Sequence, residues 1–350
     1  MSFSILCAKV AKMVKQVKKT LKKLPVMGFW AKLKKPIFVL APMSDVTDAS
    51  FRQIIAKYSR HGKKGGGPDV FWTEFVSADG LCSKGREVLL KNFSYTKGEH
   101  PIVAQIFGSK PENMKKVATL IQKLGFDGID INMGCPDRSI EKQGAGAAMM
   151  KNPKLAQEII LATMAGAPKL PVSVKTRIGY NKDELESWIG AILETKPAVI
   201  TVHARTRKEL SLVPARWENV ARAVKLAKGT GTLIFGNGDV KDLEDGKEKA
   251  LATGADGVML GRAVFGNPWL FDNTRNTKDI TLPEKFEAMI EHTHLFEKKF
   301  AGVKNFAIMK KHYKAYANGF DGAKELRVKL MSAKNANEVE KIARKFLNKR

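Results

Sequence analysis

Eight short apolar or β-branched runs alternate with helix-like segments between residues 36 and 270, and this repeat constrains the fold most. The runs cover residues 36–41, 69–75, 101–106, 128–132, 171–176, 198–203, 232–236 and 257–261. Between them apolar residues recur at helical spacing, as at Val117, Leu120, Ile121 and Leu124. Eight such units over about 235 residues match a (β/α)8 TIM barrel. A doubly wound sheet is the alternative, but the regular repeat favours a closed α/β barrel.

The pattern changes after Pro268, and from Leu282 onward it is helical throughout. The sequence therefore predicts a barrel domain over residues 36–275 and a small C-terminal helical bundle over residues 281–350. An apolar content of 44% is sufficient for a large core and argues against global disorder.

Positive charge is concentrated at the two ends of the chain. The formal net charge is +26, and residues 1–35 contain ten lysines and no acidic residue. Residues 281–350 contain 16 basic and 8 acidic residues. Charge placed outside the predicted barrel indicates a large polyanion, and we expect nucleic acid. The alternative is that excess lysine is a general solubility trait.

Residues 1–35 are expected to form a basic amphipathic extension. Apolar side chains recur at helical spacing as far as Leu24, and lysines fill most other positions. Such a helix can contact nucleic acid, lie on a membrane surface or pack on the barrel, and the sequence leaves these three open. No apolar run is long enough to cross a bilayer, so we expect no stable membrane insertion.

The cysteines and histidines predict no metal site and no disulfide framework. Cys7, Cys82 and Cys135 are odd in number and far apart, which favours a reducing, cytoplasmic compartment. Histidines in the helical region are spaced irregularly, so surface positions or RNA contact are expected rather than metal ligation. These are His292, His294 and His312.

Polar residues, or glycine, proline or sulfur-containing residues, follow each predicted strand. In a parallel barrel the carboxyl ends of the strands build the active site, so we expect these residues to converge. Cys135, just past the fourth run and followed by Pro136, is the reactive candidate, with a buried structural cysteine as the alternative. In chain order the residues are Pro42, Met43 and Ser44; Glu74; Gln105; Asn132 and Cys135; Lys175 and Arg177; His203 and Arg205; Asn237; and Gly261 and Arg262.

The last two strand ends predict a phosphate site. The segments 236–239 (GNGD) and 261–263 (GRA) combine glycines, whose N–H groups can approach a phosphate closely, with an arginine fork. A phosphate there leaves a planar ring over the barrel mouth, where Gln105 could bond its edge and Lys175 could balance negative charge. Flavin mononucleotide (FMN) fits this arrangement, and no complete dinucleotide fingerprint occurs in the chain.

Seven segments together resemble the tRNA-dihydrouridine synthase family, and the resemblance runs from Pro36 to about Ala333. They are residues 40–52 (LAPMSDVTDASFR), 130–136 (DINMGCP), 174–177 (VKTR), 202–207 (VHARTR), 236–239 (GNGD), 257–262 (GVMLGR) and 319–327 (GFDGAKELR). The last is similar to the family's helical RNA-binding domain. Residues 209–217 depart from the glycine- and aromatic-containing stretch of many members.

This resemblance implies a role for each candidate residue. Cys135 would be the proton donor, and Asn132 and Arg177 would hold the target base or its backbone. Either NADPH or NADH would donate electrons, and tRNA would be the partner. FMN would be bound by Pro42, Met43, Ser44, Gln105, Lys175, His203, Asn237, Gly238, Asp239, Gly261 and Arg262.

The chemistry of uracil reduction agrees with that division of roles. Reducing the C5=C6 bond to 5,6-dihydrouridine needs a hydride on one carbon and a proton on the other. A cysteine with an ordinary pKa near ~8.5 is protonated at neutral pH and can donate. Two alternatives remain open: a small-molecule flavin oxidoreductase of the dihydroorotate dehydrogenase type, and a non-catalytic RNA-remodelling protein.

Overall fold

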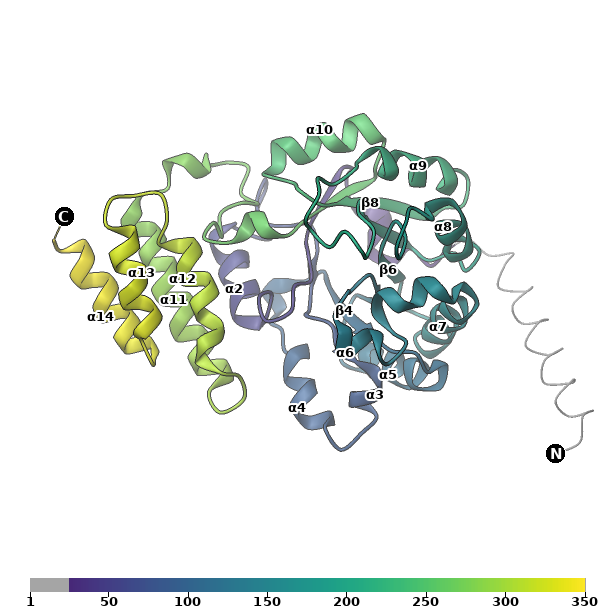
Figure 1. Ribbon diagram of the computed structural model, residues 1–350, viewed down its shortest axis with the longest axis horizontal. Coiled ribbons are helices and arrows are strands. Elements are labelled where there is room, and N and C mark those ends of the chain that lie inside the picture. Colours follow the sequence, from purple (N-terminus) through teal and green to yellow (C-terminus); the bar gives the residue numbers. More distant parts are fainter. Residues whose placement is uncertain (1–24, 350) are drawn as a thin grey trace, which may run out of the picture.

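The computed structural model describes residues 25–349 and contains a closed barrel of parallel strands (Figure 1). β2 and β3 both pair with β4 and occupy one position in the barrel, so nine strands fill eight positions. β1 pairs with β9, and a bridge from Val39 to Val70 closes the ring. The strands are β1 (Ile37–Leu40), β2 (Phe71–Trp72), β3 (Val76–Ser77), β4 (Ile102–Phe107), β5 (Gly128–Met133), β6 (Val172–Arg177), β7 (Val199–His203), β8 (Leu233–Asn237) and β9 (Gly257–Leu260).

Helices surround the strands, as the sequence predicted for a (β/α)8 barrel (Figure 1). Pro111 and Pro153 each begin a helix, where a missing N–H costs no hydrogen bond. The helices of the barrel are α2 (Ala49–Tyr58), α3 (Ala78–Leu81), α4 (Arg86–Leu90), α5 (Pro111–Lys123), α6 (Arg138–Glu141), α7 (Pro153–Gly166), α8 (Leu185–Leu193), α9 (Glu218–Ala227) and α10 (Leu243–Thr253).

A short 3₁₀ helix, η1 (Gly28–Lys32), fills the barrel at the amino ends of its strands. Its Trp30 is buried, and the ring centroid lies 5.7 Å from that of Trp72 and 5.5 Å from that of Phe235. Part of the predicted extension 1–35 therefore belongs to the barrel core. The amphipathic helix predicted before it lies outside the described residues.

The C-terminal part is a bundle of helices, confirming the second element of the predicted fold. Helix α11 begins with a capping box in which Thr281 and Glu284 bond each other's backbone N–H groups. The helices are α11 (Leu282–Phe300), α12 (Lys310–Tyr316), α13 (Ala323–Ser332) and α14 (Ala336–Leu347). Among residues 25–349 no helix has both the length and the apolar character needed to cross a membrane.

The bundle packs on helix α2 of the barrel through α11. The Tyr58 hydroxyl donates to Glu291 at 2.8 Å, and the ring of Phe51 stacks on that of His292 with centroids 4.9 Å apart. His292 and His312 are buried at this contact, so their predicted surface positions are wrong. His292 on α11 and His312 on α12 both turn inward against Phe51, and burial lowers the pKa of His292 to about 3.

A buried ion pair joins the bundle to the mouth of the barrel. Lys304, between α11 and α12, lies 2.7 Å from Glu74, which follows β2. The two side chains are 11% and 6% exposed. The other oxygen of Glu74 accepts from the N–H of Asp45 at 2.6 Å, in the loop after β1. Burial raises the pKa of Glu74 against the opposing effect of Lys304.

Removing Lys304 is expected to destabilise the protein far more than removing Lys57. Lys304→Ala leaves the Glu74 carboxylate buried without its cation, a loss of about 3–5 kcal/mol. Lys57→Ala removes a pair to Glu291 at the same domain contact, but its side chain is 60% exposed, so the loss is under about 1 kcal/mol. Urea denaturation of both variants measures the difference, and equal losses would contradict the buried pair's role.

Candidate active site at the carboxyl end of the barrel

The inward-facing side chains of three neighbouring strands form a buried polar network. Strand pairing places Gln105 beside Asp130, and Asp130 beside Ser173. The Gln105 amide donates to Asp130 at 2.6 Å and accepts from the Asn132 amide at 3.1 Å, while Ser173 donates to Asp130 at 2.5 Å. Gln105, Asp130 and Ser173 lie directly beneath the strand ends, and their hydrogen bonds fix the orientation of Asn132.

Asp130 is a functional candidate that the sequence analysis missed. It is fully buried, and this burial raises its pKa to about 6 although hydrogen bonds from Gln105 and Ser173 oppose the rise. The alternation of Ile129, Asp130 and Ile131 was the available signal, because in a strand every second side chain faces the same way. Asp130 therefore shares the barrel interior with Asn132.

Cys135 lies on a loop that two predicted site residues hold in place. The side-chain oxygen of Asn132 accepts from the N–H groups of Gly134 at 3.2 Å and Cys135 at 2.9 Å. Arg177 donates from Nε to the Gly134 carbonyl at 2.9 Å. Position 134 favours glycine, because a Cβ there would lie 3.2 Å from the backbone of Thr176.

The environment of Cys135 keeps its thiol protonated. The side chain is half-buried, and burial raises its pKa above the ordinary value, against the opposing effects of a backbone hydrogen bond from Asp137 and of the charges of Lys175 and Arg177. Such a thiol is a poor nucleophile and a competent acid at neutral pH. The geometry therefore suits proton donation better than covalent attack.

Lys175 and His203 occupy the interior of the next two strand ends. The Lys175 amine lies 3.2 Å from the side-chain oxygen of Asn237, whose amide donates to the Met259 carbonyl at 2.8 Å. Burial, followed by the charge of Arg177, lowers the pKa of Lys175 to about 8. Burial also lowers the pKa of His203 well below its ordinary value, so its ring is neutral at pH 7.

The loops after β8 and β9 offer unused backbone donors. In the described part of the chain, the N–H groups of Gly238 and Asp239 donate no hydrogen bond. The same holds, within residues 25–349, for the N–H groups of Gly261 and Arg262. Gly238 has a φ of 120°, and a Cβ there would meet Ala215 at 2.8 Å and His203 at 3.2 Å. Four free donors on adjacent barrel loops match the usual phosphate position of this fold.

The loop after β1 completes this side of the mouth. The Met43 N–H donates to Thr47 at 2.8 Å, and the Met43 sulfur lies 3.5 Å from where a Cβ on Gly261 would be. Pro42 and Met43 are half-buried and Ser44 is exposed. The predicted site residues Met43, after the first strand, and Gly261, after the last strand, therefore lie side by side.

Gln105 bonds within the protein through both its amide oxygen and its amide nitrogen, and Arg177 does so through Nε and Nη1. Gln105 is fully buried, so in this conformation it supports Asn132 from below. Arg177 donates to carbonyls on the loops that follow β5 and β7. Arg205 and Arg262 both pair with the carboxylate of Asp239, and the distance from Arg262 to this carboxylate is 2.7 Å. Asp239 therefore orients the two arginines.

These features define a parallel α/β barrel with a polar reaction centre at its carboxyl end and a free anion-binding edge beside it. The family model for dihydrouridine synthase (Dus) matches residues 39–349. The chain therefore belongs to the dihydrouridine synthase family of oxidoreductases.

Two curated relatives cover nearly the whole chain. A protein of Staphylococcus aureus named "Probable tRNA-dihydrouridine synthase" is 38% identical over 324 residues, covering 91% of this chain and 95% of that protein. A Bacillus subtilis protein, "Probable tRNA-dihydrouridine synthase 2", is 38% identical over 327 residues, covering 92% and 97%. Among solved structures, the old yellow enzyme homologue of Zymomonas mobilis has a TM-score of 0.46 at 14% identity, over 67% of this chain and 86% of that one.

Alkylation is expected to distinguish the two described cysteines. Cys82 is exposed, whereas Cys135 is half-buried with a raised pKa. Because the thiolate is the reactive form, iodoacetamide at pH 8 modifies Cys82 first, and the rate at Cys135 still rises with pH above 9. Peptide mass spectrometry over time measures both rates. Faster modification of Cys135 at pH 7 would contradict the protonated state.

Proposed function

We propose that this chain reduces the C5=C6 bond of specific uridines in tRNA to 5,6-dihydrouridine, with FMN as cofactor and NADPH or NADH as electron donor. The observation that carries the proposal is the position of Cys135 near Lys175, on a loop that Asn132 and Arg177 hold in place. The family membership and the names of both bacterial relatives support it.

The free donors on the loops after β8 and β9 fit the phosphate of FMN. Gly238, Asp239, Gly261 and Arg262 would hold that phosphate through their N–H groups. Pro42, Met43 and Ser44 would flank the ring on one side, and Lys175, His203 and Asn237 on the other. A contact from Gln105 stays a prediction, because it would require this buried amide to become accessible.

FMN, when bound and reduced, would supply the hydride for uracil. Cys135 donates the proton to the other carbon, and its raised pKa keeps that proton available at neutral pH. The Lys175 charge stabilises the negative oxygen that develops on the pyrimidine as the hydride arrives. Asn132 holds the Cys135 loop through its side-chain oxygen, while its amide nitrogen donates to the buried Gln105.

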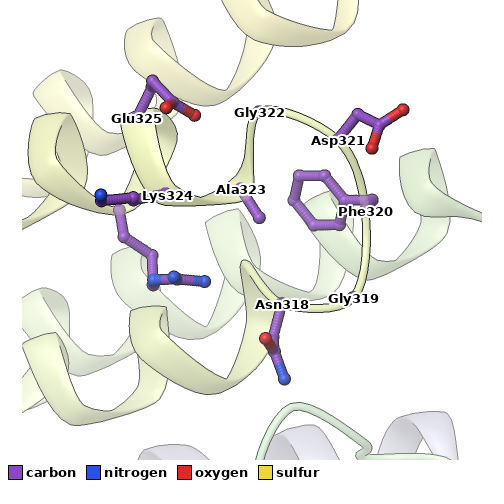
Figure 2. Close-up of a pocket in the computed structure, with 9 residues that line it drawn as sticks. Asn318, Gly319, Phe320, Asp321, Gly322, Ala323, Lys324 and Glu325 are labelled. Atoms are coloured by element: carbon purple, nitrogen blue, oxygen red, sulfur yellow. The ribbon is translucent and has the colours of Figure 1, made fainter.

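The helical bundle supports an RNA substrate. Residues 281–350 carry 16 basic against 8 acidic side chains, and phosphate contacts of this kind bind RNA largely by shape. Figure 2 shows an open depression at the start of α13, with Asn318, Phe320 and Lys324 at its edge. We propose that this surface contacts the tRNA backbone and that the enzyme acts in the cytoplasm.

Gly238→Ala is expected to abolish flavin retention while the barrel remains folded. The added methyl group would lie 2.8 Å from Ala215 at a φ of 120°, so the phosphate loop must move. The parent protein should purify yellow with a flavin absorbance band near ~450 nm, and the variant colourless with an unchanged circular dichroism spectrum. Colourless parent protein after reconstitution with FMN would contradict the cofactor assignment.

Cys135→Ala is expected to lose most reduction of tRNA while binding is retained. Purified protein, NADPH and unmodified tRNA transcripts are incubated, and dihydrouridine is mapped by position. A Cys82→Ala variant is the matched control and should retain activity. Activity on free pyrimidines but on no tRNA would favour the dihydroorotate dehydrogenase type, and full function of Cys135→Ala would favour a non-catalytic role.

A further inference from the structure

The loop between β7 and α9 exposes two leucines beside the barrel mouth. Leu210 is 41% exposed and Leu212 is 83% exposed. Single exposed apolar residues are ordinary on protein surfaces. Two in three consecutive positions, at the edge of a reaction centre, are the kind of local apolar surface that marks a binding site. We call residues 209–213 the leucine loop.

Two buried arginines hold the leucine loop from below. Arg177 donates to the carbonyls of Thr206 at 3.0 Å and Leu210 at 2.8 Å, and Arg205 donates to that of Val213 at 2.6 Å. The Arg177 and Arg205 residues are only 7% and 2% exposed. Charge-assisted hydrogen bonds from buried donors fix a loop strongly, so this loop presents its leucines from a defined backbone.

Both ends of the leucine loop are anchored as well. Glu209 accepts from the N–H of Thr206 at 2.7 Å and pairs with Arg216 at 2.6 Å. The N–H of Ala215 donates to Asp239 at 2.9 Å. The loop therefore does not need a partner to order it, and a ligand that contacts the leucines gains that contact with little loss of loop entropy.

Leu210 has a backbone conformation that leucine rarely adopts. Its φ is 54°, in the left-handed region that favours glycine, and the hydrogen bond from Arg177 holds it there. An unfavourable backbone conformation that the surroundings enforce points to a function rather than to a gain in stability. At position 210 this backbone conformation belongs to an apolar residue whose side chain is partly exposed to solvent.

The same guanidinium that holds Leu210 also holds the loop of Cys135. Arg177 reaches the Gly134 carbonyl through Nε at 2.9 Å and the Leu210 carbonyl through Nη1 at 2.8 Å. The leucine loop therefore borders the position from which a pyrimidine would approach the thiol. Lys208 precedes the loop in the chain and is exposed, which suits a polyanion at this rim, whereas Arg207 is paired with Glu141.

We propose that the leucine loop is a wedge that packs against an RNA base next to the extruded target uridine. A uridine stacked within a folded RNA must leave its stack to reach the barrel, and its neighbour then loses a stacking partner. Apolar side chains inserted at the broken step replace part of that contact. The inference rests on the proposed function, since it needs an RNA substrate.

The test compares Leu212→Ser with Leu251→Ser on two substrates. Leu251 is 87% exposed on α10, so it is a matched leucine away from the leucine loop. The substrates are an unmodified tRNA transcript and a short single-stranded oligonucleotide containing the same uridine. Because burying an exposed leucine side chain changes affinity by about 10- to 150-fold, kcat/KM of Leu212→Ser should fall by that factor on the transcript and far less on the oligonucleotide.

Leu251→Ser should match the parent protein on both substrates, and Leu212→Met should recover most of the loss. An equal loss on both substrates would overturn the wedge, because the loop would then only support the reaction centre. No loss on the transcript would overturn it too.

A binding measurement separates the wedge from the proposed reaction. 2-Aminopurine placed beside the target uridine in the transcript becomes brighter when it unstacks. The parent protein and Leu251→Ser should raise its fluorescence equally, and Leu212→Ser should raise it much less. This readout needs no turnover. Brightening that depends on Leu212, without dihydrouridine formation, would therefore contradict the proposed reaction and support the wedge. Equal brightening by all three proteins would overturn the wedge.

Discussion

Closure of the parallel sheet is the constraint on which the rest of the molecule depends. Once β1 pairs with β9 and bridges to Val70, each strand has one face inside the ring and one outside. Strand register then decides which polar residues meet, and it places Asp130 between Gln105 and Ser173. The reaction centre is thus a consequence of alternation along the strands, applied eight times around one axis.

Burial determines the electrostatics of this centre more than ion pairing does. It keeps the Cys135 thiol protonated, the His203 ring neutral and the Lys175 ammonium easier to deprotonate than usual. The buried guanidinium of Arg177 avoids an isolated charge by donating to three backbone carbonyls, so it orders two loops at once. Burial at the barrel mouth therefore favours a protonated thiol and fixed loops together.

The barrel, its strand positions and its polar rim were predictable from the sequence because they follow local periodicity. The predicted strand 69–75 is interrupted, since Glu74 turns toward Lys304, which is 230 residues away in the chain. No sequence pattern signals such a distant partner. The substrate role predicted for Arg177 stays a prediction. The bonds from its Nε and Nη1 to backbone carbonyls depend on loop conformation, which no sequence pattern signals.

Trp30 helps to close the amino end of the described barrel. With Trp72 and Phe235 it fills the amino end of the described barrel, so molecules reach the centre from the carboxyl end. In the proposed reaction, the nicotinamide donor and the RNA then compete for one opening. If both use it, one would have to depart before the other arrives, and double-reciprocal plots at several donor concentrations would then be parallel lines. The packing of Trp30 at the amino end therefore bears on how the two substrates would share the opposite end of the barrel.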